Sequence, residues 1–367
     1  MKKASRTSQR RMTRREFVGG AMAGAGVILG APALLRGRNL NDKLDIAFIA
    51  SGGRAIANIK ELTMTPWDGG AAPAAPHPDE NVVVLCDVDQ NALDAASQRF
   101  PKAAKFNDLR RVFDKPDAFD AVVVSTAEHT HAFATYLALT HGKHVYCEKP
   151  LTYNIWEARL IRETAARYPT LSTQMGNQGH ASPTRRTIKE ILMTGVIGPV
   201  REVHVWAERA WGLQDAASAE KFDKPHGFYN GIQIVERFKE EMPTPPTNHF
   251  DLWLGPAPVR PYHATYFPGP RWYRWWDFGN GTMSDLGSHR NDLAFYALDV
   301  RAPLTVEAVA DRPAHPELAP ATMTVTYEFP ARGAMPPVTL TWYQGEARPK
   351  IWTDGGIPQW LDAQLFV

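Results

Sequence analysis

The feature that most constrains the fold of this 367-residue chain is a regular alternation of short apolar runs with helix-like segments. Each run is long enough for one buried strand, and each following segment is long enough for a helix that crosses back over the sheet. The alternation predicts an α/β fold built on a doubly wound parallel sheet. The apolar runs occupy residues 45–49, 82–86, 120–126, 144–147 and 171–175.

The first apolar run leads into a turn that is typical of dinucleotide-binding sites. Residues 50–55 read Ala-Ser-Gly-Gly-Arg-Ala, so only the middle glycine of the G-x-G-x-x-G pattern is kept, at Gly52. A strand, a turn and a helix in this order aim free N–H groups and the positive helix end at a phosphate. We therefore predict that Gly52, Gly53 and Arg54 contact a nucleotide cofactor.

Asp87 ends the second apolar run and is the predicted acceptor for the ribose hydroxyls of the cofactor. It lies 35 residues after Gly52, and 20 residues after it once a Pro/Ala/Gly-rich surface insertion at 65–79 is set aside. A carboxylate at this point repels a 2′-phosphate, so the sequence favours NAD over NADP. The alternative is a helix N-cap role, which Asp89 can fill instead.

Lys149 follows the run at 144–147 and stands between Glu148 and Pro150. In an open parallel α/β sheet, ligands bind outside the carboxyl ends of the strands, so an ammonium at this point faces the cofactor turn. Pro150 stops strand pairing and restricts the backbone of the lysine. The alternative is a surface lysine that merely closes a strand.

Four motifs together make the chain resemble the glucose–fructose oxidoreductase/inositol dehydrogenase/MocA family of NAD(P)-dependent oxidoreductases, over nearly everything after residue 43. The resemblance implies a Rossmann-type nucleotide domain followed by an α+β domain with an open-faced, mainly antiparallel sheet. It implies that the second sheet covers the nicotinamide and, in some members, forms an oligomer interface, so we expect a homo-oligomer. The motifs lie at residues 52–54, 148–151, 175–178 and 285–289.

The resemblance assigns catalysis to Lys149, Asp285 and His289. Hydride transfer from a secondary alcohol needs a base for the hydroxyl proton and a group that stabilises the developing alkoxide. His289 suits the base, because the ordinary pKa of histidine, about 6.5, lies near working pH. Asp285 lies four residues earlier, which on a helix places it to orient the ring or the substrate. An Asp/His pair at this spacing also suits a helix-surface hydrogen bond or half of a metal site.

Further contacts are predicted along the carboxyl edge of the sheet and in the aromatic segment before residue 280. Aromatic faces stack on the C–H faces of sugars, although ordinary packing is the alternative for each tryptophan. No metal centre is predicted, because the histidines are scattered and no His-Glu-x-x-His or cysteine cluster occurs. The predicted cofactor contacts are Ser125, Thr126, His129, Glu148, Lys149 and Gln178, and the predicted substrate contacts are Asn177, Trp275 and Trp276.

The first 38 residues have the pattern of an export signal, with Arg14 and Arg15 of a twin-arginine motif before an uncharged, glycine-rich stretch at 18–35. A membrane anchor is the alternative, but the glycines make the stretch weakly apolar. The segment carries nine Lys/Arg and one acid, so a net charge of +2 leaves about −6 on the rest, with no basic face for nucleic acid. We expect a periplasmic or otherwise exported protein that uses the twin-arginine export machinery.

Two domains are expected after the signal, a nucleotide domain at 39–168 and a substrate domain at 169–367. The resemblance implies further strands and a closing helix, so the second domain is expected to be truncated at its C-terminus. Cys86 and Cys147 fall on the strands predicted at 82–86 and 144–147, which the usual strand order separates by two others. At about 4.8 Å per strand they lie about 14 Å apart, too far for a disulfide.

These features together predict an exported oxidoreductase that transfers hydride between a tightly bound NAD and a secondary hydroxyl of a sugar or cyclic polyol. Twin-arginine export moves folded proteins, so we expect the cofactor to be acquired in the cytoplasm and to stay bound. Two alternatives remain open. One is an NAD-dependent glycosidase or lyase that transiently oxidises a sugar, and the other is a non-catalytic sugar-binding protein on the same fold.

Overall fold

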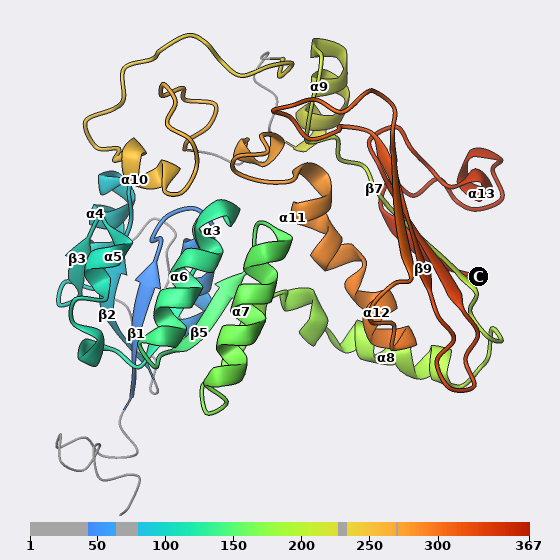
Figure 1. Ribbon diagram of the computed structural model, residues 1–367, viewed down its shortest axis with the longest axis horizontal. Helices are drawn as coiled ribbons and strands as arrows, with labels where there is room; N and C mark the ends of the chain where they lie inside the picture. The colour runs from blue at the N-terminus through green and yellow to red at the C-terminus, as the bar shows by residue number, and fades with distance from the viewer. Residues whose placement is uncertain (1–42, 64–79, 227–232, 269–270) are drawn as a thin grey trace, which may run out of the picture. The chain divides into compact units, whose positions relative to one another are not determined.

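The structure is a computed structural model, which describes residues 43–63, 80–226, 233–268 and 271–367 (Figure 1). The export signal predicted at 1–38 and the insertion predicted at 65–79 lie outside the described residues. Residues 44–367 form one compact unit that contains two β-sheets. No helix within the described ranges is long and apolar enough to cross a membrane.

The first sheet has six parallel strands in the order β3-β2-β1-β4-β5-β6, which confirms the predicted doubly wound sheet. Its central strands are continuously apolar because helices cover both faces. β6 lies beyond residue 168, where we placed the end of the nucleotide domain, and the division into two domains stays a prediction. The strands are β1 (Leu44–Ile49), β2 (Glu80–Cys86), β3 (Ala104–Phe106), β4 (Ala121–Val124), β5 (His144–Glu148) and β6 (Thr173–Gly176).

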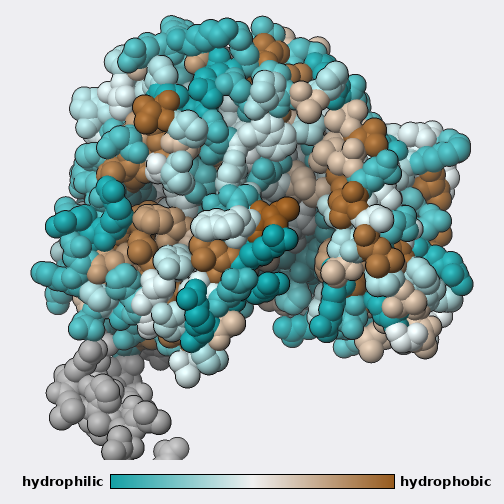
Figure 2. All heavy atoms as spheres, in the orientation of Figure 1, coloured by the Kyte–Doolittle hydropathy of each residue, from teal (hydrophilic) through white to brown (hydrophobic). Residues whose placement is uncertain are grey.

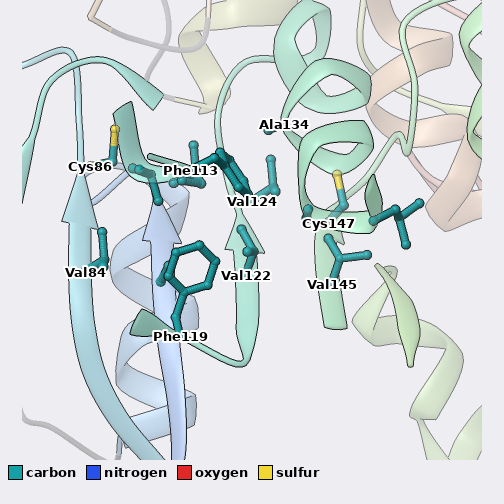
Figure 3. Close-up of a cluster of buried hydrophobic side chains, with 14 residues drawn as sticks. Val84, Cys86, Phe113, Phe119, Val122, Val124, Ala134, Val145 and Cys147 are labelled. Atoms are coloured by element: carbon teal, nitrogen blue, oxygen red, sulfur yellow. The ribbon is translucent and has the colours of Figure 1, made fainter. Parts of the chain in front are cut away.

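Side chains alternate between the two faces of this sheet, and each face packs against its own helices. One face buries Val84, Val122 and Val124 against Ala134 of α6 (Figure 3). The other face buries Phe48 against residues of α3 and α4. The helices of this layer are α3 (Arg54–Thr63), α4 (Gln90–Arg99), α5 (Leu109–Val112), α6 (Glu128–Thr140) and α7 (Ile155–Arg167), with a 3-10 turn η1 (Pro116–Ala118).

The two cysteines are buried free thiols in the first of these cores (Figure 3). Cys86 lies on β2 and Cys147 on β5, with β1 and β4 between them in the sheet. The prediction that they are not joined by a disulfide is therefore confirmed. Burial raises the pKa of Cys86 well above its ordinary value, so this thiol is neutral.

The second sheet has the order β11-β7-β10-β9-β8. β7 and β10 run parallel, and the other neighbouring strands are antiparallel. The sheet is therefore mainly antiparallel, as expected, with one parallel pair. One face buries Val203, Leu340 and Trp342 against α8, α11 and α12, which lie on one side of the sheet in Figure 1. The elements are β7 (Glu202–Ala207), β8 (Thr305–Ala310), β9 (Met323–Phe329), β10 (Val338–Gln344), β11 (Ala363–Phe366), α8 (Pro183–Met193), α11 (Gly281–Arg290) and α12 (Asp292–Leu298).

The segment between β7 and α11 contains short helices around a buried aromatic cluster. Trp253, Tyr266, Trp275 and Phe278 belong to this cluster, and their irregular spacing gives no helical period. On the face seen in Figure 2, hydrophobic residues form separate groups among hydrophilic ones. The short elements are α9 (Ala216–Asp223), η3 (Lys224–His226), α10 (Phe250–Leu254) and η4 (Trp272–Arg274), and elsewhere η2 (Gln178–Ala181) and α13 (Lys350–Thr353).

Candidate active site

The turn after β1 is held by the carboxylate of Asp87. Its Oδ2 accepts the N–H groups of Ser51 and Gly52 at 2.7 and 3.0 Å, and its Oδ1 accepts that of Asp89 at 2.9 Å. Burial raises the pKa of Asp87, while these N–H donors favour its charged form. Asp89 caps α4 by accepting the N–H of Asn91 at 3.0 Å. The structure thus places Asp87 at the predicted turn, where it also fixes the backbone.

Ala50 stands where the dinucleotide pattern has its first glycine, and its backbone adopts a left-handed conformation with a φ of 80°. Its N–H donates to the carbonyl of Cys86 at 2.8 Å, which holds the residue in this conformation. Gly53 has a φ of 51°, and a Cβ built there meets nothing within 4 Å. The outer side of the turn is therefore open to the close approach of a phosphate.

A cavity of about 800 Å³ extends from this turn along the carboxyl ends of β1, β2, β4 and β5. Ligand pockets commonly have volumes of about 300–1,000 Å³, so a dinucleotide fits. Beside Asp87, the cavity is lined by Asp89, Asp108 and Arg110, and Arg110 is bonded to Asp108 at 2.7 Å. Such an acidic end suits a ribose better than a 2′-phosphate. The predicted cofactor contacts that line the cavity are Gly52, Gly53, Arg54, Asp87, Ser125, Thr126, Glu148 and Lys149.

Of the two histidines at the start of α6, the structure places His131 on the cavity wall and the predicted contact His129 away from it. His129 is buried with its Nε2 at 2.9 Å from the Trp253 carbonyl, and burial lowers its pKa to about 4. Both ring nitrogens of His131 face carbonyls, of Pro150 at 2.7 Å and Thr126 at 2.9 Å. Burial opposes a charge there, but the Cys147 sulfur and these carbonyls outweigh it and raise the pKa of His131 to about 9.

Glu148 joins the lysine-bearing strand to the helix that follows the cofactor turn. Its Oε1 accepts bonds from Arg54 Nε at 2.8 Å, Asn58 Nδ2 at 3.0 Å and Tyr146 Oη at 3.4 Å. Arg54 and Asn58 lie on α3, so the glutamate fixes the distance between that helix and the end of β5. Lys149, the next residue, is thereby held in a constant place relative to the cavity.

Lys149 reaches from the cavity to α11. Its Nζ donates to the carbonyl oxygen of Asp285 at 3.0 Å and forms an ion pair with the Asp285 carboxylate. Both side chains are largely buried, and Nζ also lies 5.9 Å from the ring centre of Tyr273. The two predicted catalytic residues, 136 positions apart in the sequence, are thus in direct contact.

Asn177 holds the third predicted catalytic residue, His289. The Asn177 Nδ2 donates to the Ser288 carbonyl at 2.9 Å, which leaves its Oδ1 to accept the Nδ1–H of His289 at 2.9 Å. The lone pair of the imidazole is then on Nε2. Burial and the nearby Lys149 charge lower the pKa of His289 to about 4, so the ring is neutral at neutral pH.

Asp285, His289, Asn177 and Gln178 do not line the main cavity, and Lys149 alone of the catalytic three does so. The structure places Asn177 and Gln178 on a second cavity of about 400 Å³. Gln178 is exposed there, away from the predicted cofactor contact, because it follows β6 at the edge of the sheet.

The predicted substrate contacts Trp275 and Trp276 also lie away from the cavity wall. Trp275 is wholly buried in the aromatic cluster, and the Nε1 of Trp276 donates to the His315 carbonyl at 3.0 Å. Trp272 and Tyr273, in the preceding turn, line the cavity instead. Four aromatic residues among five positions carry no sequence signal that tells which of them face a ligand.

Within the described ranges, no group of three His, Cys, Asp or Glu side chains is arranged to hold a metal ion. The expectation that the site needs no metal stays a prediction. Sequence reasoning missed Asn58 and Glu128, on the helices that follow β1 and β4, and it chose His129 rather than His131 as the cofactor contact. The sequence shows that these residues follow a strand end. It does not show which face of the helix each side chain lies on.

Comparison with known proteins identifies the family. Residues 69–174 match the oxidoreductase family with an NAD-binding Rossmann fold, and residues 222–334 match the C-terminal alpha/beta domain of the same family. The chain therefore belongs to the glucose–fructose oxidoreductase/inositol dehydrogenase/MocA oxidoreductases, and its nucleotide domain is of the NAD-binding type.

Individual relatives are distant and only partly covered. The chain is 28% identical over 200 residues to the Bacillus subtilis protein YteT, which covers 51% of this chain and 43% of that protein. It is 27% identical over 124 residues to the inositol 2-dehydrogenase of Salmonella typhimurium, covering 34% and 37%. The solved structure of GenD2 from gentamicin A biosynthesis, in complex with NAD, is 16% identical, with a TM-score of 0.55 over 85% of this chain and 68% of that one. This last likeness shows the shared fold.

The strained backbone at Ala50 generates a prediction about stability. A left-handed alanine costs about 1–2 kcal/mol, and a glycine loses about 0.5–1 kcal/mol of entropy, so Ala50→Gly is expected to raise the free energy of unfolding by about 0.5–1 kcal/mol. Urea unfolding measures the change, provided that the free energy of unfolding depends on urea concentration with the same slope in the variant and the wild type. The control Ala47→Gly, in the middle of β1, is expected to destabilise the protein, and a loss of stability in both variants would contradict the strain at Ala50.

Proposed function

We propose that this protein is a dehydrogenase that transfers hydride between NAD and a secondary hydroxyl of a sugar or cyclic polyol. The observation that carries the proposal is the contact of Lys149 with Asp285 at the end of the cavity, with a neutral His289 on the same helix. The family match and the relatives named as inositol 2-dehydrogenases support a cyclic polyol or related sugar. The matched region spans less than half of either named relative, so the activity is inferred for this chain.

The residues divide the chemistry between them. NAD, when bound, takes the hydride. Lys149 uses two of its three N–H donors on Asp285, and the third is available to hold a substrate oxygen and stabilise a developing alkoxide. His289 is neutral, with its lone pair on Nε2, so we assign this atom to accept the hydroxyl proton. Its pKa of about 4 makes it a weaker base than the ordinary value of about 6.5 led us to expect, and because it does not line the main cavity, the substrate hydroxyl has to reach it beside Lys149. Asn177 keeps the ring in that tautomer.

The export-signal pattern predicted at 1–38 supports a protein that works outside the cytoplasm. Twin-arginine export carries folded proteins, and no pool of free NAD is expected beyond the inner membrane. We infer that the nucleotide stays bound and is reset within the site, either by a second carbonyl compound or by re-reduction of the oxidised substrate.

Retention of the cofactor is tested on the exported protein. Protein purified from the exported fraction and then denatured is expected to release about one equivalent of nucleotide, seen by absorbance and identified as NAD rather than NADP. A variant with Arg14 and Arg15 replaced by lysine is the control for export, and it is expected to be absent from the exported fraction. An active enzyme that is free of nucleotide and needs millimolar NAD would contradict retention.

The catalytic roles are tested by Lys149→Ala and His289→Ala, with the exposed Lys102→Ala as a control. Both variants are expected to keep bound nucleotide but to lose about 10²–10⁴-fold in turnover, because general acid–base groups contribute about this much. Reduction of bound NAD by a library of sugars and polyols, followed by product analysis, is the measurement. Hydrolysed or dehydrated products would favour a glycosidase or lyase, no reaction would favour a sugar-binding protein, and unchanged rates in both variants would remove the mechanism.

We also propose that a second copy of the chain pairs with the β8 edge of the second sheet. β8 is an edge strand, and all six of its residues are exposed, including Val306 and Val309. An open apolar edge invites pairing, and a lysine there blocks it. Light scattering is expected to give at least twice the mass of one chain, and Val306→Lys is expected to lower it while the loop control Val259→Lys does not. A monomeric wild-type protein would contradict this proposal.

A further inference from the structure

Glu128 is a wholly buried acid that joins the nucleotide side of the site to the catalytic helix. It is the first residue of α6, and it is 0% exposed. Its Oε1 accepts the hydroxyl of Ser284 at 3.1 Å, and Ser284 is the residue before Asp285 on α11. Its Oε2 is buried as well and has no hydrogen-bond partner among the described residues.

Glu128 is close enough to the catalytic ion pair for both of its charges to act on the carboxyl group. A Cβ built at Gly279 would lie 3.4 Å from the Oε2, so the carboxyl group packs closely against the backbone of that segment. Burial, and then the charge of Asp285, raise the pKa of Glu128 from its ordinary 4.5 to about 8, so the group is a neutral acid at neutral pH. The titratable groups that face it are His131 on α6, Lys149 after β5, Tyr153 before α7, Tyr273 in η4 and Asp285 on α11.

Lys149 consequently has two carboxyl groups within its electrostatic reach. It is bonded to the charged one, Asp285, and it also favours the charged form of Glu128. While Glu128 is neutral, the ammonium has one anionic partner and a donor left for substrate. Once Glu128 ionises, a second buried anion attracts the ammonium, because opposite charges interact strongly where water is excluded.

We propose that Glu128 is a positioning residue of the catalytic site, which as a neutral acid leaves Lys149 bonded to Asp285 and on ionising draws Lys149 away from the substrate. This inference rests on the proposed hydride transfer at Lys149. The step moves one proton, from the Glu128 carboxyl to solvent, and breaks no other bond. The position of the Lys149 ammonium then depends on the pH of the solution.

The pH profile of turnover tests the proposal. The turnover of the wild-type enzyme is expected to fall as the pH rises, with a midpoint near pH 8, and we call this fall the alkaline limb. Glu128→Gln keeps the size of the side chain but does not ionise, so it is expected to lack this limb. Ser284→Ala removes a donor that favours the charged form, so its limb is expected at higher pH. Glu163→Gln, an exposed glutamate on α7, is the control and keeps the wild-type profile. An alkaline limb at the same pH in wild type and Glu128→Gln would overturn the proposal.

Stability gives a second readout that needs no substrate. The folded pKa of Glu128 lies above the unfolded one, so its unfavourable effect on folding is absent below pH 4.5, grows as pH rises, and is complete above about pH 8. Urea unfolding is therefore expected to show Glu128→Gln gaining stability over wild type from pH 5 to pH 8. A difference that does not change with pH, in an enzyme that turns over, would overturn the inference alone. A rising difference in a protein that oxidises no sugar or polyol would overturn the proposed function and this inference with it.

Discussion

The buried ion pair between Lys149 and Asp285 is the interaction on which the rest of the site depends. The two side chains are 13% and 8% exposed, so each charge is in a place where it is costly without its partner. A well-packed apolar pair would serve stability at least as well, so stability is a weak reason for the pair. Its position at the end of a cavity for a dinucleotide gives it a functional reason.

Three sets of hydrogen bonds hold this ion pair and its neighbours in place. Glu148 ties the end of β5 to α3, and His131 bonds the carbonyl of Pro150, on the other side of Lys149. Asn177 fixes the ring of His289 through its Oδ1. Each set of hydrogen bonds connects a strand end to another element, so the parallel sheet sets the geometry of the site. Such a rigid arrangement is expected where reacting groups must be held at fixed distances.

The sequence predicts the sheet well because continuous apolar runs with helices between them allow few folds. It also predicts which strand ends face the cavity, and Lys149 and Asp87 line the cavity there. Asp285, which lies on α11, was assigned through the family resemblance, and it contacts Lys149. It fails where the direction of a side chain decides the role. His129 and His131 differ by two positions on one helix, and only the second faces the cavity, while Trp275 points into the aromatic cluster.

The decisive measurement is a crystal structure of the purified protein at saturating NAD. We expect NAD in the cavity of about 800 Å³, with its pyrophosphate at the turn of Gly52 and Gly53, its ribose at Asp87, and its nicotinamide ring beside Lys149. The ammonium is expected to remain in contact with Asp285. A nucleotide bound elsewhere, or a cavity that stays empty at saturating NAD, would contradict the account.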